Sequence, residues 1–243
     1  MRQMIAAQTV METRMLLRNG EQLTVTMIIP LVLLAMFSLE PLVSVGGRRI
    51  DFLAPGIIAL AVMSTAFTSQ AIATGFERRY GVLKRLGAEP LSQAGLISAK
   101  TASVIAIELL QAAVITAVAF GLGWHPHARA LAFLTVPLLV LAGTAAFSGL
   151  ALLMAGALRA EATLALANLI YIVLLGLGGV VFPLSKFPAA AHPYLTLLPT
   201  GALATGLRSV LASEAGVPVR DLIVLAVWAV AAIGLAARTF RWE

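Results

Sequence analysis

Long uncharged runs of apolar residues divide this chain into segments suited to crossing a membrane. A bilayer core about 30 Å thick needs roughly 20 apolar residues per helix. The last run is shorter, but the arginines that follow it can snorkel and extend it. None of the runs alternates between apolar and polar residues as the strands of a membrane β-barrel do. The pattern therefore predicts six transmembrane helices, over residues 22–39, 52–76, 101–124, 130–158, 162–182 and 222–240.

Two further segments are rich in apolar residues without being typical of spans. Residues 1–21 mix apolar and charged side chains, which suits a helix lying at the cytoplasmic membrane surface or a simple basic anchor. Residues 183–221 are mostly uncharged but are interrupted by prolines and glycines. Irregular backbone in a bilayer must be covered by protein or water, so we expect a re-entrant helical hairpin on the outer side. The residues that mark this element are Pro183, Pro188, Pro199 and Arg208.

The composition agrees with a membrane environment. Hydrophobic residues make up 60% of the chain and charged residues 12%, and the mean hydropathy is +0.97. A soluble domain of 243 residues with this composition would expose a very large apolar surface. We therefore predict an all-α integral membrane protein that forms one transmembrane domain over residues 1–243.

The positions of Lys and Arg predict the orientation of the spans. With the N-terminus in the cytoplasm, eleven of the 17 basic residues lie in cytoplasmic segments and six in outer ones. We therefore expect a multi-pass protein with both termini in the cytoplasm. Basic residues next to an anionic inner leaflet also explain the net charge of +6, so we expect the lipid bilayer, and no nucleic acid, as their partner.

One acid, Glu108, lies well inside a predicted span, where an ionisable group is costly unless it is paired or hydrated. It could face a substrate path or a protomer interface and recognise a cationic or hydroxylated substrate. It could equally bind Ser103, Thr116 or a neighbouring helix, or be protonated. The second span has a polar side that could line the same path or help helices pack. The residues assigned to the path are Glu108, Thr68, Ser69 and Gln70.

The sequence contains no motif for catalysis or metal binding. The three histidines have no acidic pair nearby, and there is no cysteine. A P-loop needs a lysine preceded by glycine, whereas Lys84, Lys100 and Lys186 all follow other residues. We therefore predict no enzyme activity, no metal and no ATPase site in this chain.

The most charged internal segment, residues 76–92, reads FERRYGVLKRLGAEPLS and lies between two uncharged runs. As a helix it places Phe76 and Tyr80 on one face, with Arg78 and Arg85 on the opposite face. On composition alone, these charges could merely hold the loop in the cytoplasm.

This segment carries a resemblance to a known family. Residues 77–86, ERRYGVLKRL, followed by PLS at 90–92, resemble the cytoplasmic segment after the second span in permeases of type-2 ABC transporters. The run GVVFPLSKFP at 179–188, with LPT at 198–200 and LR at 207–208, is similar to the fifth span and outer re-entrant element of that family. Both blocks occur in the expected order, so the resemblance covers essentially the whole chain.

The resemblance implies a permease subunit of an ATP-driven exporter. In this family two permeases, identical or different, pair around a substrate path. Each rests on a cytoplasmic P-loop ATPase, which holds the ATP and Mg²⁺. The segment after the second span is then a coupling helix, and residues 1–21 form a second contact with the ATPase. The residues that the resemblance assigns to ATPase coupling are Glu77, Arg78, Arg79, Tyr80, Gly81, Leu83, Lys84, Arg85 and Leu86.

The pattern is most similar to the drug-export branch of this family in the bacterial cytoplasmic membrane, which links the chain to multidrug resistance. Spans with few aromatic or charged residues favour a hydrophobic or amphipathic drug or lipid as substrate. Two alternatives stay open. One is an ion-coupled secondary transporter, although such proteins commonly carry more ionisable groups and a repeated broken-helix pattern. The other is a membrane anchor or regulator of an ATPase that transports nothing.

Overall fold

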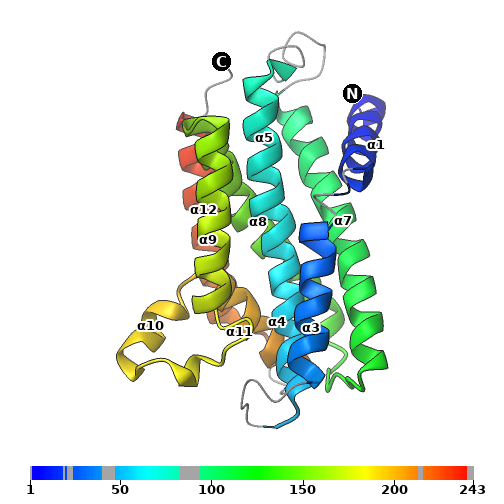
Figure 1. The fold of residues 1–243 in the computed structure, drawn as a ribbon, viewed down its shortest axis with the longest axis vertical. Coiled ribbons are helices and arrows are strands. Elements are labelled where there is room, and N and C mark those ends of the chain that lie inside the picture. Colours follow the sequence, from blue (N-terminus) through cyan, green and yellow to red (C-terminus); the bar gives the residue numbers. More distant parts are fainter. Residues whose placement is uncertain are drawn as a thin grey trace.

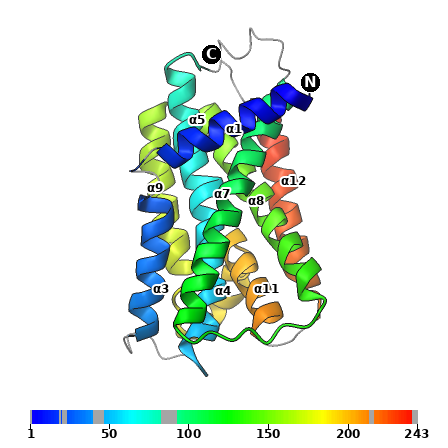
Figure 2. The same ribbon diagram turned by 90° about the vertical axis from the view of Figure 1, so that its right-hand side faces the viewer.

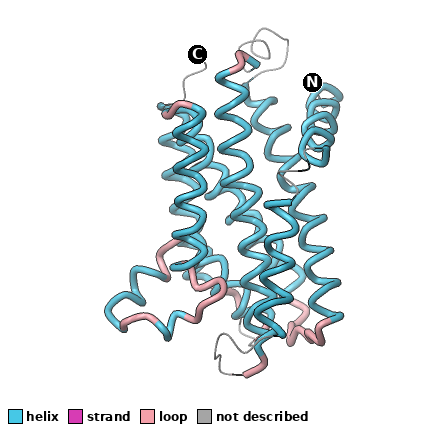
Figure 3. Tube along the Cα trace, in the orientation of Figure 1, coloured by secondary structure: helices cyan, strands magenta, loops and turns pink. Residues whose placement is uncertain are grey.

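The chain folds into a bundle of helices. A computed structural model describes residues 2–18, 20, 24–39, 47–82, 93–212 and 216–239. Within these residues there is no strand, which confirms the all-α prediction (Figure 3). The α-helices are α1 (Arg2–Arg18), α3 (Ile29–Leu39), α4 (Arg49–Met63), α5 (Gln70–Arg79), α7 (Gln93–Gly121), α8 (Ala132–Ala157), α9 (Ala160–Leu177), α10 (His192–Leu195), α11 (Pro199–Leu211) and α12 (Val219–Thr239). Single π-helical turns, η1 (Thr24–Ile28) and η2 (Ser64–Ser69), precede α3 and join α4 to α5.

The described residues include five helices long and apolar enough to cross a membrane, so the protein is a multi-pass membrane protein. They are Arg49–Arg79, Ser98–Gly121, Ala132–Ala157, Ala160–Leu177 and Val219–Thr239. The first expected span, 22–39, corresponds to a shorter apolar helix, Thr26–Leu39. Residues 22 and 23 lie outside the described part of the chain. The count of six spans therefore stays a prediction.

The continuous helix α4–η2–α5 occupies the centre of the bundle (Figure 1). Within its most apolar stretch, 89% of the residues are buried, far more than in any other span. Helices α3, α7 and α11 pack against α4, while α8 and α9 pack against α5. This central helix therefore contacts most of the other long helices.

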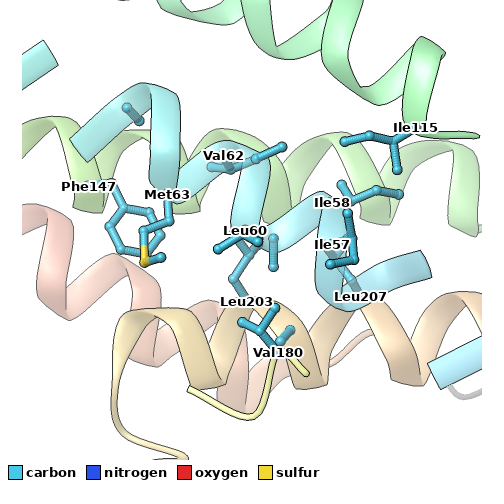
Figure 4. Close-up of a cluster of buried hydrophobic side chains, with 14 of the residues drawn as sticks. Ile57, Ile58, Leu60, Val62, Met63, Ile115, Phe147, Val180, Leu203 and Leu207 are labelled. Carbon is cyan, nitrogen blue, oxygen red and sulfur yellow. The ribbon is translucent and has the colours of Figure 1, made fainter. Parts of the chain in front are cut away.

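Buried side chains from α4, α8 and α11 interlock around this helix (Figure 4). Leu60, Met63, Phe147 and Leu203 are fully shielded, and Val180 closes the cluster from the turn after α9. Lipid tails are as apolar as leucine, so close van der Waals packing holds such helices together in a membrane, rather than release of water.

The proline- and glycine-rich stretch before the last span contains short helical turns that project from the bundle, followed by a helix that packs into it (Figure 1). Two 3₁₀ turns, Leu184–Lys186 (η3) and Ala189–Ala191 (η4), lead through the short α10 into α11. Helix α11 packs against α4, α8 and α12 at the end of the bundle opposite both termini (Figure 1). Gly201 allows a tight return, because a Cβ there would lie 2.2 Å from the Leu195 carbonyl oxygen.

Helix α1 has a different direction from the spans. It lies across α7 and packs against it near the end of the bundle where α5 ends (Figure 2). The described ends of the chain are at this same end (Figures 1 and 2). This arrangement places the N-terminal helix at the same end of the bundle as the end of α5 (Figures 1 and 2).

Candidate coupling site and substrate path

The central helix ends at Arg79, two residues before Gly81. This glycine has a φ of +69°, and the backbone N–H of Gly81 donates to the Arg78 carbonyl at 3.1 Å. A left-handed glycine commonly terminates a helix in this way. The single helix expected from Phe76 through the charged segment is therefore interrupted, since α5 ends at Arg79. Four of the expected coupling residues lie outside the described part of the chain, namely Leu83, Lys84, Arg85 and Leu86.

Glu77 belongs to a buried ion cluster. The Lys100 Nζ lies 2.7 Å from a carboxylate oxygen of Glu77 and 3.2 Å from one of Glu12. The Gln8 side-chain amide also donates to Glu12, at 3.0 Å. Glu12 is on α1, Glu77 on α5 and Lys100 on α7, so one ammonium group joins three helices.

Arg78 and Arg79, which follow Glu77, bind the region between α8 and α9. Arg78 donates to the carbonyl oxygens of Gly156 and, at 2.6 Å, Leu158, at the C-terminal end of α8. These carbonyls have no partner within their own helix, and a cation there also complements the helix dipole. Arg79 forms an ion pair with Glu161 in the first turn of α9. Arg78 and Arg79 therefore tie the end of α5 to the turn between α8 and α9.

Tyr80 and Val82, just after α5, are large apolar residues exposed at this end, with exposed fractions of 65% and 38%. The Tyr80 ring stacks on Phe76 at a centroid distance of 6.1 Å, and the Arg79 guanidinium lies 5.8 Å from the Tyr80 ring centroid. Tyr80 thus presents a positioned aromatic surface that a partner can reach.

Glu108 is buried between α7 and α8, with 4% of its surface exposed. The Thr144 hydroxyl on α8 donates to one carboxylate oxygen at 2.7 Å. The other carboxylate oxygen, Oε1, has no hydrogen-bond partner among the described residues. The prediction that Glu108 could bind a neighbouring helix therefore agrees with the contact to α8. The Ser103 hydroxyl, another expected partner of Glu108, donates to the Lys100 carbonyl instead.

The polar side of the second span faces the interior of the bundle. Thr68, Ser69 and Gln70 are at most 6% exposed and lie in or directly after η2. In the same turn, the Thr65 hydroxyl donates to the side-chain oxygen of Gln111 at 2.9 Å. π-Turns of this kind are frequent at functional sites. Ser69 and Gln70 lie beside Lys100 and Ser103 of the neighbouring α7.

At the opposite end, Arg208 joins three elements. Its Nε donates to the Phe52 carbonyl at 2.9 Å and its Nη2 to the Val180 carbonyl at 2.7 Å. The guanidinium also lies 3.7 Å from the Phe52 ring centroid. Gly56 makes room for it, because a Cβ there would lie 2.4 Å from Nη2. Arg208 therefore holds α11 to α4 and to the turn after α9.

The three prolines expected in the re-entrant element lie at the starts of helical elements. Pro183 and Pro188 directly precede η3 and η4, and Pro199 is in the first turn of α11. Proline suits the first helical turn, since the N–H that it lacks has no helical partner there.

A comparison with protein families matches residues 5–212 to the model described as ABC-2 type transporter. The chain belongs to this family. It is the permease subunit of a type-2 ABC transporter, as the sequence resemblance implied, and this family domain has no ATPase site of its own. A search of curated proteins finds no match to the chain.

Several residues of this ABC-2 permease that the sequence did not single out take part in these contacts. They are Glu12, Lys100, Gln111 and Thr144. The sequence did offer a hint for Lys100. This lysine directly precedes a predicted span, and a lysine that is buried there needs a nearby acidic partner. The described residues contain no group of three His, Cys, Asp or Glu side chains that could hold a metal ion.

Proposed function

We propose that this permease is the membrane subunit of an ATP-driven exporter that moves a hydrophobic or amphipathic drug or lipid out of the cytoplasm or the inner leaflet. The observation that carries the proposal is the set of contacts at the end of α5. Three consecutive charged residues, Glu77–Arg79, bind Lys100 of α7 on one side and the α8–α9 turn on the other, and Lys100 in turn binds Glu12 of α1. A push on the segment that follows α5 would therefore move the whole end of the bundle.

The motor is a separate P-loop ATPase that binds ATP and Mg²⁺. Two permeases, each with an ATPase against the segment after α5 and against α1, form the working transporter in the bacterial cytoplasmic membrane. Closure of the ATPases on ATP favours the state in which the path between the permeases opens outward. This is a shift between two conformations, biased by a nucleotide bound to another subunit.

In this arrangement both termini and Tyr80 lie in the cytoplasm, and α10 and α11 form the outer re-entrant element. The path residues are Glu108 and the polar side of the second span. The carboxylate oxygen of Glu108 that has no hydrogen-bond partner within the described part of the chain is available to a donor group on a substrate. Such a donor suits a cationic amphipathic drug, and export of such compounds would appear as multidrug resistance.

The first test is to purify the tagged permease from its native membrane in mild detergent, identify the co-purifying proteins by mass spectrometry, and assay ATP hydrolysis. We expect a stoichiometric P-loop ATPase whose activity responds to lipids or amphipathic drugs. A lone oligomer that transports under an ion gradient would overturn the proposal in favour of a secondary transporter. A stable ATPase complex that transports nothing would favour an anchor or regulator.

The contact itself is tested with two exposed tyrosines at opposite ends of the bundle, Tyr80 and Tyr194 (65% and 73% exposed). Loss of a tyrosine anchor at a protein interface costs about 2 kcal/mol, or roughly 30-fold in affinity. Tyr80→Ala should weaken ATPase binding by about that factor and lower transport, whereas Tyr194→Ala should leave both unchanged. Equal ATPase affinity for the two variants would refute a contact at Tyr80.

A further inference from the structure

The Glu12–Lys100–Glu77 cluster is unusually well shielded. Its three side chains are between 8% and 13% exposed, whereas each of the other ion pairs among the described residues has a partner at least half exposed. Removing charges from water costs several kcal/mol per ion, and apolar residues of similar size often hold a core at least as well. Stability alone therefore does not account for three buried charges at this position.

The cluster faces a row of polar residues on the central helix. Gln70, Thr74 and Glu77 are spaced at i, i+4 and i+7, which places them on one side of α5. Gln70 and Thr74, together with Glu12 and Lys100, line a small cavity of about 20 Å³. The Gln70 Oε1 and the Thr74 hydroxyl are buried there with no hydrogen-bond partner among the described residues.

That cavity has the size and the chemistry for one water molecule. A water needs a space of about 10–15 Å³ and two to four polar partners. A water can donate to Gln70 Oε1 and to Thr74, and its own oxygen can accept from the Lys100 ammonium. One bridging molecule would thus extend the ion cluster by two turns along α5.

We propose that Glu12, Lys100 and Glu77, with one bridging water, form a polar joint that makes α1 and the end of α5 move as one body. The proposal deepens the proposed function, on which it rests. An ATPase that touches α1 and the segment after α5 would then act on a single rigid unit. Lys100 is the positioning residue of this joint, because its ammonium is the group bound by carboxylates from both helices.

A purely structural cluster and a coupling joint respond differently to one variant. In Glu12→Leu/Lys100→Met/Glu77→Leu, apolar side chains replace all three charges, so no unpaired charge remains buried. We expect an unfolding temperature equal to or above that of the wild type. We also expect the substrate transported per ATP hydrolysed by the full complex to fall at least about fivefold, the lower range of measured coupling between sites. An unchanged ratio in the folded variant would overturn the proposal.

Lys100→Arg is the matched conservative variant. Guanidinium retains the positive charge and can bind two carboxylates, so transport per ATP should stay close to the wild-type value. A folded Lys100→Arg protein as poorly coupled as the triple variant would contradict a joint based on charge.

A third measurement does not depend on the ATPase. Because the chain has no cysteine, spin labels can be placed at Val10→Cys on α1 and Val82→Cys after α5, both of which are exposed. For the permease alone in lipid nanodiscs, we expect a narrow distance distribution that broadens in the triple variant. Equal widths would overturn the joint even if the ATP-driven function holds. Failure of the wild type to bind an ATPase would instead refute the proposed function.

Discussion

Glu108 is a buried ionisable group and Arg208 a partly buried one, and their polar atoms are satisfied to different extents. Arg208 donates to two backbone carbonyls and stacks over Phe52. Glu108 accepts from Thr144 through one carboxylate oxygen, and the other has no partner among the residues that the structure describes. A group whose hydrogen bonds are filled by its own chain stabilises structure. An acceptor left open at such a depth can take a hydrogen bond from a ligand or from a water.

Glu108→Gln tests this distinction. The amide oxygen of glutamine can still accept from Thr144, so we expect normal amounts of folded permease. Hydrogen bonds to a charged group contribute about 1.5–3 kcal/mol, so export of a cationic drug should fall at least about tenfold. The measurement is transport into inside-out vesicles, with Thr144→Val as the control for loss of the helix contact alone. Unchanged transport and drug resistance in Glu108→Gln would mean that the carboxylate is structural.

Arg208→Lys tests the structural role at the opposite end. A lysine ammonium has no planar fork and cannot reproduce the two carbonyl contacts and the stacking on Phe52 together. We expect the free energy of unfolding to fall by about 2 kcal/mol, from one charge-assisted hydrogen bond and part of the cation–π contact. Thermal unfolding in detergent measures the change, and the exposed Arg220→Lys is the control. An equal effect of the two substitutions would show that the guanidinium of Arg208 contributes nothing to stability.

At the scale of elements, the sequence predicted the long helices because charges punctuate the apolar runs. The expected span 52–76 corresponds to the helix Arg49–Arg79, and 130–158 to α8, Ala132–Ala157. The sequence did not predict which span lies at the centre, since all of them are similarly apolar. The burial of the second span depends on neighbours far away along the chain, which periodicity does not identify.

The elements around the ends of spans were less predictable. The charged segment was expected to continue as one helix, but Gly81 adopts a left-handed conformation and ends α5. The partner of Lys100 on α1 is 88 residues away, and neither periodicity nor local charge pairing relates the two positions. Prolines and glycines in 183–221 did indicate a broken region. They did not reveal that α11 would be buried against three spans.

Close contact between α8 and α12 depends on Gly149. A Cβ at this position would lie 2.9 Å from the Ala232 Cβ and 3.0 Å from the Ile233 backbone nitrogen. Gly149→Ala should therefore push the two helices apart and destabilise the fold by about 1–3 kcal/mol. Gly234→Ala on α12 is the matched control, because a Cβ there meets nothing within 4 Å. Thermal unfolding of both variants should show a loss for position 149 and none for 234.

For the whole molecule, large apolar side chains point outward along several spans. Phe133 is 89% exposed, Val230 75% and Ile172 64%, on α8, α12 and α9 respectively. Exposure on this scale suits a surface covered by lipid or by a second permease. At the end where α5 stops, Tyr80 is followed by the charged segment, which suits contact with water or with a soluble protein.

The whole-molecule prediction is the orientation of the bundle, and the chain suits its measurement because it has no cysteine. Tyr80→Cys and Tyr194→Cys place single thiols at exposed sites at opposite ends. In right-side-out vesicles containing the permease alone, a membrane-impermeant maleimide should label position 194 and not 80, and inside-out vesicles should give the reverse. The cysteine-free parent is the blank. The opposite pattern would invert the orientation and place Glu77–Arg79 outside, beyond the reach of a cytoplasmic ATPase. Labelling of both positions from one side would contradict the bundle itself, because the three spans between them, α7, α8 and α9, could then not all cross the membrane.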